Sequence, residues 1–396
     1  MANLNTLDPM KFMQLVPQRQ AVIEAAEAKP LPASDASKAI ACALHPARQH
    51  LRIVEVIEHG RDCKSYTLAP DEDRGTGSLA YFSAGQYLTV YLDVDGMPIT
   101  RAYSISSSPT EALEGAYRLT VKYVQDCLAT RYILDTWQVG SEVETSGPLG
   151  NFTYSGLRDA AHVIGVAGGS GITPFASMAK AIADGAEDFS LTVLYGSRTA
   201  DGILLRDELD GLAATCEKIR FVHVLSDEER TGYEHGFVTA HLISKYAPEG
   251  EYSVFLCGPQ EMYRFVDKEI EKLGIRRKFV RHELFGEMHC PEREADYPGC
   301  KAERVNVTVT IRGETRTVEG SAHDTILQTL EKAGVAMPAR CRSGECGWCR
   351  SLLKSGKVYV PKDTDGRRKA DLKFGYIHPC CTFPLGDVEI EASAAK

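Results

Sequence analysis

The sequence predicts a multidomain protein: an antiparallel β-barrel, then an α/β domain with a parallel sheet, then a small domain with clustered cysteines. Three observations predict this order. The chain has 396 residues, which suggests two or three domains rather than one core. Short strand-like segments separated by turns occupy residues 49–152, whereas strand and helix patterns alternate from about Ala161. Five of the 12 cysteines fall within the last 60 residues.

Composition is that of an ordinary globular protein and argues against a general nucleic-acid binder. Hydrophobic residues make up 43% of the chain and charged residues 25%, and the formal net charge is −9. A nucleic-acid binder would need a basic face to neutralise phosphates. No apolar run is long enough to span a bilayer, and the first residues lack the pattern of a signal peptide. We therefore expect a cytoplasmic protein.

Changes of pattern along the chain predict five segments. Residues 1–46 are expected to form an N-terminal extension, with an amphipathic helix at 17–28 and then an Ala/Pro/Ser-rich linker. Residues 286–302 have no apolar periodicity and are expected to join two domains. The three domains are predicted at 47–156 for the barrel, 157–285 for the parallel-sheet domain and 303–396 for the C-terminal domain.

A cysteine loop in the C-terminal domain carries the most specific motif. Cys341, Cys346 and Cys349 are spaced C-x4-C-x2-C, and another cysteine follows about thirty residues later. This is the plant-type spacing for a 2Fe–2S cluster. Gly344 and Gly347 permit the sharp turns that such a loop needs. The alternative is a zinc site, but zinc prefers two C-x2-C pairs, or cysteine with histidine, at other spacings.

The whole C-terminal domain resembles plant-type ferredoxins. The resemblance covers two strands around a hairpin at Gly313, the helix after them, the cysteine loop, and the closing HPCCTFPLGDVEIE. It implies a β-grasp fold and a fourth ligand four residues before a proline, which Pro384 places at Cys380 rather than Cys381. If the segment is extended, adjacent side chains point to opposite sides, so only one of these two cysteines can face the loop.

Two motifs within the predicted barrel are informative in combination. The segment Arg101-Ala-Tyr103-Ser104 is expected to open a strand, and a Gly-Pro-Leu-Gly-Asn-Phe segment that begins at Gly147 closes the same barrel. The combination resembles the ferredoxin–NADP reductase superfamily and so implies a flavin site. There Arg101 would hold the flavin pyrophosphate, Tyr103 would stack on the isoalloxazine ring, and Ser104 would sit near its reactive nitrogen. The alternative is that Tyr103 is a core aromatic and Arg101 a surface charge.

A second part of the expected flavin site follows the strand that contains Val121 and Lys122. In the superfamily a Gly-x-x-Ser turn after such a strand binds the pyrophosphate. Here Thr130 would replace the serine, and Cys127 stands where glycine is usual. We expect FAD, with FMN as the alternative that the unusual Cys127 leaves open.

A glycine-rich turn predicts a nucleotide site at the start of the parallel-sheet domain. An apolar strand at 162–167 runs into Gly168, Gly169, Gly171 and Thr173, and a helical pattern follows. Such glycines let backbone N–H groups approach a pyrophosphate at a helix N-terminus. The pattern is not the G-x-G-x-x-G fingerprint, so a purely structural turn is the alternative.

Two further segments point to the nicotinamide end of that site. Cys257, Gly258 and Pro259 end the fourth strand, at the carboxyl edge where such sheets bind ligands. In the superfamily this cysteine lies beside the nicotinamide, although an inert core thiol is the alternative. Glu283 and Phe285 resemble the closing E-x-F element that borders the flavin.

The preferred dinucleotide is expected to be NADH rather than NADPH. NADPH-selective relatives often follow the third strand with Ser-Arg, whereas this chain continues from Ser226 with the acidic residues 227–229. Those carboxylates would repel a 2′-phosphate. Against this, Arg198 follows the second strand and could reach the same phosphate.

The order of the domains resembles the family of reductases that includes phthalate dioxygenase reductase and the phenylacetyl-CoA epoxidase reductase subunit. The resemblance implies that electrons pass from NAD(P)H through the flavin and the cluster to a protein acceptor. A self-contained reductase of a small molecule is the alternative. No general base is needed for hydride transfer, and we expect Ser104, Cys257 and Glu283 to line the transfer site. Trp348, between two cluster cysteines, marks either a docking surface or local packing.

Overall fold

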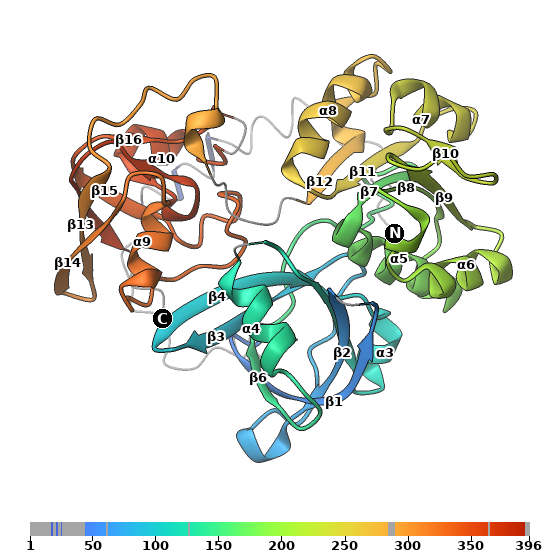
Figure 1. Ribbon diagram of the computed structural model, residues 1–396, viewed down its shortest axis with the longest axis horizontal. Helices are drawn as coiled ribbons and strands as arrows, with labels where there is room; N and C mark the ends of the chain where they lie inside the picture. The colour runs from blue at the N-terminus through green and yellow to red at the C-terminus, as the bar shows by residue number, and fades with distance from the viewer. Residues whose placement is uncertain are drawn as a thin grey trace. The chain divides into compact units, whose positions relative to one another are not determined.

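The computed structural model describes most of the chain after Leu44 (Figure 1). Most of the predicted N-terminal extension lies outside the described residues, and the few described positions of its predicted helix are helical and exposed. No helix in the described part of the chain is both long and apolar enough to cross a membrane. The described residues are 17, 18, 21, 22, 25, 44–60, 62–125, 127–283, 290–362 and 365–392.

The first sheet, drawn in blue to teal in Figure 1, is antiparallel throughout. Its strand order is β4-β3-β6-β1-β2-β5. The two edge strands meet at a backbone bridge between Ile105 and Leu119, which curls the sheet into a barrel. The strands are β1 (Gln49–Glu58), β2 (Cys63–Pro70), β3 (Tyr87–Val94), β4 (Met97–Ser104), β5 (Tyr117–Lys122) and β6 (Glu142–Thr145).

Strand β4 corrects one sequence expectation. The segment from Arg101 to Ser104 ends this strand rather than opening it. The reason is a tight turn at Asp95 and Gly96, both of which have positive φ, as in the Asp-Gly turns that favour two-residue hairpins. The strand therefore starts at Met97 and ends at Ser104, and the barrel also carries two helices, α3 (Pro109–Leu113) and α4 (Leu128–Thr136).

The second sheet is parallel throughout, as the strand–helix alternation predicts. Its order is β10-β9-β8-β7-β11-β12. Separate apolar clusters fill its two faces. The strands are β7 (His162–Gly168), β8 (Ser190–Ser197), β9 (Ile219–Leu225), β10 (Glu234–His235), β11 (Ser253–Cys257) and β12 (Val280–Glu283), and the helices are α5 (Thr173–Ala183), α6 (Arg206–Thr215), α7 (Ala240–Tyr246) and α8 (Gln260–Glu271).

The strand order of this sheet reverses at β7. The chain proceeds outward through β8 and β9 on one side of β7 and then returns to place β11 on the other side. Open α/β sheets bind their ligands at the carboxyl ends of the strands at such a switch point. The carboxyl ends of β7 and β11 are Gly168 and Cys257, so the topology puts a ligand site where the sequence motifs predict it.

The third sheet, drawn in orange to red in Figure 1, is mixed and packs on one helix. Its order is β14-β13-β19-β15-β17, with β13 and β19 parallel. A capping box between Thr325 and Gln328 starts the helix. The elements are β13 (Arg304–Ile311), β14 (Glu314–Ser321), α9 (Ile326–Lys332), β15 (Ser351–Ser355), α10 (Lys369–Phe374), β17 (Tyr376–Ile377) and β19 (Val388–Ala392), with a separate pair β16 (Val358–Tyr359) and β18 (Phe383–Pro384).

The described part of the expected connection 286–302 is packed rather than loose. The Tyr297 ring lies 5.1 Å from the Tyr359 ring, and Tyr359 Oη donates to Asp296 at 2.7 Å. On its other side Glu294 accepts a hydrogen bond from Arg264 of α8. These contacts tie the segment both to the parallel-sheet domain and to the C-terminal domain.

Candidate functional site

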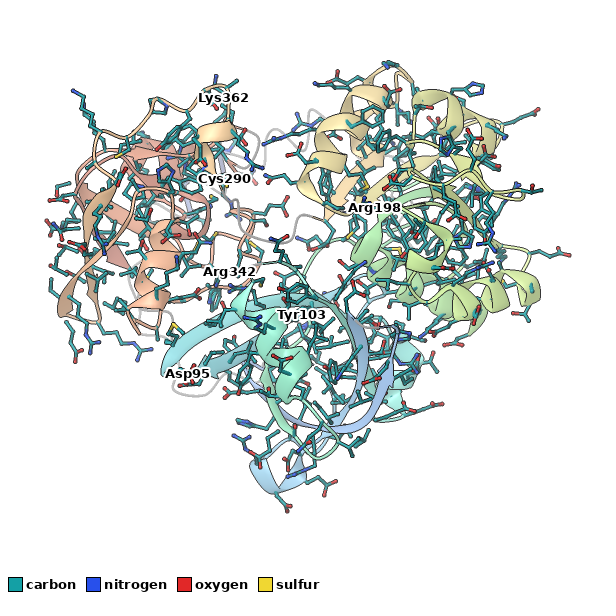
Figure 2. The ribbon with its side chains drawn as sticks, in the orientation of Figure 1. Asp95, Tyr103, Arg198, Cys290, Arg342 and Lys362 are labelled. Carbon is teal, nitrogen blue, oxygen red and sulfur yellow. The ribbon has the colours of Figure 1, made fainter. Side chains whose placement is uncertain are left out.

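A cavity of about 570 Å³ lies between the end of β4, the carboxyl ends of β7 and β11, and the cysteine loop. Figure 2 labels Tyr103 and Arg342, which line it from the barrel and from the loop. The predicted site residues that line it are Arg101, Tyr103, Ser104, Lys122, Thr130, Gly171, Thr173, Cys257, Gly258, Pro259, Glu283 and Cys341.

Five of the predicted flavin and nucleotide residues do not line this cavity. Val121 is fully buried in the barrel core, and Gly147 packs on Pro46, whose carbonyl oxygen accepts its N–H at 2.9 Å. Gly168 ends β7 and Gly169 begins the 3-10 turn after it, and Arg198 directly follows the carboxyl end of β8. Another predicted residue, Phe285, lies outside the described residues.

The end of β4 carries a buried hydroxyl without a partner. Tyr103 Oη is buried and has no hydrogen-bond partner among the described residues. Burial raises the pKa of this phenol, so it remains a donor at neutral pH. Ser104 beside it is 5% exposed. An unpartnered donor on a cavity wall costs stability unless a ligand satisfies it, which fits the polar edge of a flavin ring.

The neighbouring Arg101 lies beside the first turn of α4. Its guanidinium donates to the Thr100 carbonyl at 2.8 Å and lies 3.8 Å from the Glu331 carboxylate. No side chain caps the N-terminus of α4, and Thr130 folds its hydroxyl back onto the preceding turn. An arginine next to an uncapped helix N-terminus fits a phosphate group.

The glycines at the two strand ends are required by packing. A Cβ on Gly171 would clash with the carbonyl of Cys257, and one on Gly258 would clash with Met262. Gly168 also has no room for a side chain, because a Cβ there would lie 2.7 Å from the Met262 sulfur. The turns after β7 and β11 therefore pack backbone to backbone, and that contact shapes the nucleotide side of the cavity.

Cys257 and Glu283 are neighbours across the parallel pair of β11 and β12. Tyr263 joins them, because its hydroxyl accepts from the Gly258 N–H at 3.1 Å and donates to the Glu283 carbonyl. Burial, followed by the nearby Glu345, raises the pKa of the Glu283 carboxyl well above its usual range. Burial likewise raises the pKa of the Cys257 thiol, so burial disfavours the charged form of both groups.

Arg198 is held by an acidic residue at the ends of β8 and β9. Its Nε lies 2.7 Å from Asp227 Oδ2, and the Ser226 hydroxyl donates to the other Asp227 oxygen at 2.6 Å. The side chain of Arg198 is 86% exposed. Arg198, which could bind a 2′-phosphate, and Asp227, which would repel one, thus form an ion pair with each other.

The cysteine loop brings four predicted ligands together. Cys349 Sγ lies 3.4 Å from Cys380 Sγ, and Cys341 Sγ accepts the Cys346 N–H at 3.4 Å. Of these cysteines, Cys346 is exposed and the others are buried. In the described ranges no three His, Cys, Asp or Glu side chains are arranged around a single metal ion. Four thiols from one loop and one distant turn suit a 2Fe–2S cluster, which four cysteines hold.

The local geometry at Cys380 differs from the expectation. The segment Pro379–Cys381 is a 3-10 helix, so the premise of an extended segment was wrong. Successive side chains on such a helix are rotated by about 120°, and the two thiols have different partners although they also interact with each other. Cys380 Sγ approaches Cys349, whereas Cys381 Sγ lies 3.5 Å from the His378 carbonyl. The choice of Cys380 as the fourth ligand stays a prediction.

A buried ion pair that the sequence did not predict links the loop to the barrel. Arg342 is 1% exposed, and its two terminal nitrogens lie 2.6 and 2.7 Å from the Glu331 carboxylate oxygens. The same guanidinium donates to the Thr100 hydroxyl on β4 at 3.1 Å. Both residues read as ordinary surface charges in the sequence, and only their contacts in the fold reveal the pair.

Three family models match consecutive parts of the chain. They are described as an oxidoreductase FAD-binding domain, an oxidoreductase NAD-binding domain and a 2Fe-2S iron-sulfur cluster binding domain. The matched residues are 50–154, 166–268 and 309–385. The FAD- and NAD-binding models cover the barrel and the parallel sheet, and the third covers the cysteine loop.

Reductase subunits of several oxygenases resemble most of the chain. The ferredoxin reductase component of 3-ketosteroid-9-alpha-monooxygenase from Mycobacterium tuberculosis is 30% identical over 85% of this chain and 93% of its own. The glycine betaine monooxygenase reductase subunit of Pseudomonas aeruginosa is 27% identical over 87% and 95%. Among solved structures, phthalate dioxygenase reductase matches with a TM-score of 0.63 and 26% identity, over 87% of this chain and 97% of its own.

Proposed function

Because the chain belongs to the family of FAD- and 2Fe–2S-containing ferredoxin reductase components, we propose that it is the reductase component of an oxygenase or another multicomponent enzyme. It is an NAD(P)H-dependent oxidoreductase with FAD-, NAD- and 2Fe–2S-binding domains. Its relatives are reductase subunits of glycine betaine and ketosteroid monooxygenases, which supports a protein as the electron acceptor. Cysteines that stay reduced so that they can bind a cluster are typical of a reducing compartment, which supports a cytoplasmic location.

One observation carries this proposal. A single cavity is lined by Tyr103 and Ser104 of the barrel, by Cys257 and Glu283 of the parallel-sheet domain, and by the predicted cluster ligand Cys341. Residues from the predicted flavin, nicotinamide and cluster sites thus line the same cavity. Short distances between redox centres are what a chain of electron carriers requires. We propose 1–46 as an extension, 47–156 and 157–285 as the flavin and nucleotide domains, 286–302 as the connection, and 303–396 as the cluster domain.

The residues of the cavity divide into groups that would bind the flavin and groups that would face the nicotinamide. When bound, the flavin takes a hydride from the nicotinamide and passes single electrons to the cluster. Arg101 and the N-terminus of α4 would hold the flavin phosphates, and the Tyr103 hydroxyl would donate to the flavin. Cys257 and Glu283 would face the nicotinamide, and their burial disfavours a negative charge next to the transferred hydride.

The dinucleotide we propose is NADH. The observation in favour is the ion pair between Arg198 and Asp227, because Asp227 already pairs with the arginine that would have to bind a 2′-phosphate. The Asp227 carboxylate would also repel that phosphate. The groups within this pair are exposed, so NADPH should still bind, but more weakly.

A cysteine variant tests the order of the carriers. We expect Cys346→Ser to lose the cluster EPR signal and the transfer to one-electron protein acceptors such as cytochrome c. NADH-driven reduction of ferricyanide should persist, because the flavin can serve that acceptor directly. The control is Cys216→Ser, at the end of α6, which should keep both activities.

Two results would contradict the proposed order. Loss of ferricyanide reduction in Cys346→Ser, with flavin still bound, would mean that electrons do not leave the flavin independently of the cluster. Full transfer to cytochrome c by the cluster-free variant would favour the alternative, a self-contained reductase of small molecules whose cluster is not on the path.

A further inference from the structure

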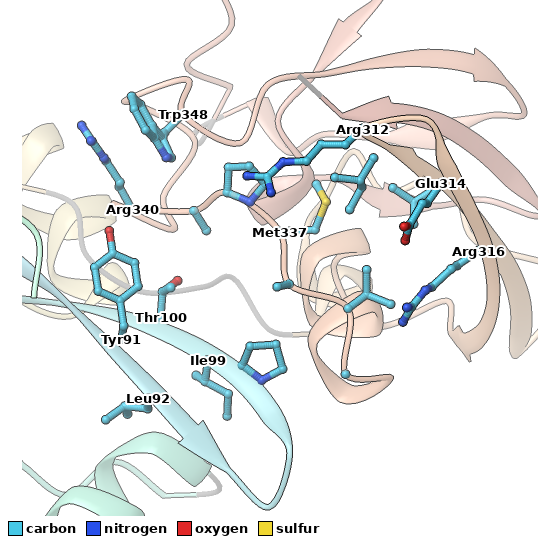
Figure 3. Close-up of a pocket in the computed structure, with 18 of the residues that line it drawn as sticks. Tyr91, Leu92, Ile99, Thr100, Arg312, Glu314, Arg316, Met337, Arg340 and Trp348 are labelled. Carbon is cyan, nitrogen blue, oxygen red and sulfur yellow. The ribbon is translucent and has the colours of Figure 1, made fainter. Parts of the chain in front are cut away.

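A second groove, of about 770 Å³, shares only Ile99 with the lining of the cofactor cavity. Its walls come from β3 and β4 of the barrel, from the hairpin of β13 and β14, and from the segment 334–340 with Trp348. Figure 3 shows Trp348 and Arg340 at one end of this groove and Glu314 and Arg316 at the other. No residue with an expected role in flavin or nucleotide binding lines it.

The charge of the groove is opposite to that of the chain. Its charged lining residues are four arginines, at 48, 312, 316 and 340, and one acid, Glu314. The whole chain carries a formal charge of −9. Arg48 also pairs with Glu144 at the rim, at 2.6 Å, which reduces but does not reverse the balance. A basic groove on an acidic protein selects for an anionic partner.

Two of these guanidinium groups are held in place by aromatic rings. The Arg48 guanidinium carbon lies 3.5 Å from the centre of the Tyr91 ring, and that of Arg340 lies 3.4 Å from the Trp348 ring. Stacking of this kind fixes the plane of an arginine while leaving its N–H groups to bind carboxylates. Pre-organised arginines lose less entropy when a partner docks.

The Trp348 end of the groove borders the exposed edge of the predicted cluster. The backbone N–H of Trp348 donates to Cys346 Sγ at 3.4 Å, and Cys346 is the exposed one of the four predicted ligands. Trp348 itself is 36% exposed. A partner bound at this end of the groove would therefore lie next to the exposed predicted ligand Cys346.

Apolar side chains form the middle of the groove. Leu92 and Ile99 line it from the barrel, and Met337 lines it from the segment after α9 (Figure 3). Apolar centres with arginine and tryptophan at the rim are typical of protein–protein interfaces.

We propose that this groove docks an acidic segment of the acceptor protein, so that its electron-accepting centre comes to rest against the Cys346 edge. This rests on the proposed function, in which the acceptor is a protein. Carboxylates of the partner would pair with Arg48, Arg316 and Arg340, and its apolar side chains would cover Met337. Electrostatic attraction of this type mainly raises the rate of association, and salt should weaken it.

The test uses two small haem proteins of opposite charge as acceptors, the acidic cytochrome b5 and the basic cytochrome c. The variant is Arg48→Gln/Arg316→Glu in the full-length holoprotein. We expect its KM for cytochrome b5 to rise by about tenfold or more, with no rise for cytochrome c. A poly-glutamate peptide should compete with cytochrome b5 on the wild type, and poly-lysine should not.

The matched control is Arg304→Glu, on the same sheet but outside the groove, where Arg304 pairs only with Glu319 among the described residues. It should leave the KM for cytochrome b5 unchanged. An equal rise in both variants, or no effect of the double variant and of poly-glutamate, would overturn the proposal. A change in sedimentation of the double variant would assign the groove to a second copy of the chain and overturn it as well.

Failure of the proposed function would be seen separately. NADH-driven bleaching of the cluster, measured by stopped flow without any acceptor, should be the same in the wild type and the double variant. If NADH does not reduce the cluster even in the wild type, the proposed electron path is wrong. If the cluster is reduced normally and the charge of the groove has no effect on either haem protein, only the docking site is wrong.

Discussion

Removal of Glu331 is expected to weaken the link between the cysteine loop and the flavin barrel. The Glu331 carboxylate is the partner of Arg342, which is 1% exposed, and it lies 3.8 Å from Arg101. Burial raises the pKa of Glu331 to about 7 and Arg101 opposes that shift, so the carboxylate is ionised above neutral pH. Glu331→Ala would remove both carboxylate oxygens that accept hydrogen bonds from the buried Arg342 guanidinium.

The expected cost follows from the burial of the pair. Removing one member of a buried ion pair destabilises a protein by about 3–5 kcal/mol, because the other charge stays buried without compensation. The exposed pair of Arg304 and Glu319, whose side chains are 74% and 56% exposed, gives the contrast. Such surface pairs contribute about 0–1 kcal/mol. Glu331→Ala should therefore lower the melting temperature of the cluster domain by about 10 °C or more, and Glu319→Ala by a few degrees at most.

The assay combines thermal unfolding with stopped-flow kinetics at a pH of about 8, where Glu331 is ionised. Reduction of the flavin by NADH should keep its rate in Glu331→Ala, whereas transfer from flavin to cluster should slow, because the loop is no longer fixed against β4. The variant Glu331→Leu/Arg342→Met removes both charges and should recover most of the stability. If Glu331→Ala and Glu319→Ala melted within a few degrees of each other, the pair would not be the link that we describe.

Three further outcomes are expected. Asp227→Asn, which releases Arg198, should raise the NADPH-to-NADH ratio of kcat/KM by about tenfold, and an unchanged ratio would mean that this pair does not set the preference. Cys380→Ser should lose most of the iron and the EPR signal while Cys381→Ser keeps both, and the reverse pattern would move the fourth ligand to Cys381. Arg101→Ala should weaken FAD binding by about 1.5–3 kcal/mol, measured by flavin fluorescence, and recovery of FMN alone from the wild type would show that the cofactor is not FAD.

Elements whose turn residues or periodicity lie within a short stretch of the chain could be predicted from the sequence. The Gly313 hairpin is such a case, because its turn residues are encoded within a few positions of each other. The strand–helix alternation likewise predicts the parallel sheet, and the glycine turn after β7 lies where the nucleotide motif indicates. The placement of β4 was wrong because the Asp95-Gly96 turn, itself a local signal, was not used.

Features that depend on contacts between distant segments could not be predicted. Arg342 is separated by 242 residues from Thr100, and nothing near either residue marks the bond. The 3-10 turn at Pro379–Cys381 and the packing of Tyr297 on Tyr359 are likewise set by the surrounding domain rather than by local pattern. Gly171 is a mixed case, because the sequence indicates a glycine turn but only the fold shows that the Cys257 carbonyl leaves no room for a side chain.

The most direct test of the electron path is an anaerobic titration of the purified protein with NADH, followed by absorbance and low-temperature EPR. We expect FAD, about two irons per chain, and a rhombic EPR signal that NADH generates without any added mediator. Cys216→Ser should behave identically, and Cys346→Ser should show flavin bleaching alone. A protein that binds zinc instead of iron, or one whose flavin is bleached by NADH while an intact cluster stays oxidised, would contradict the account.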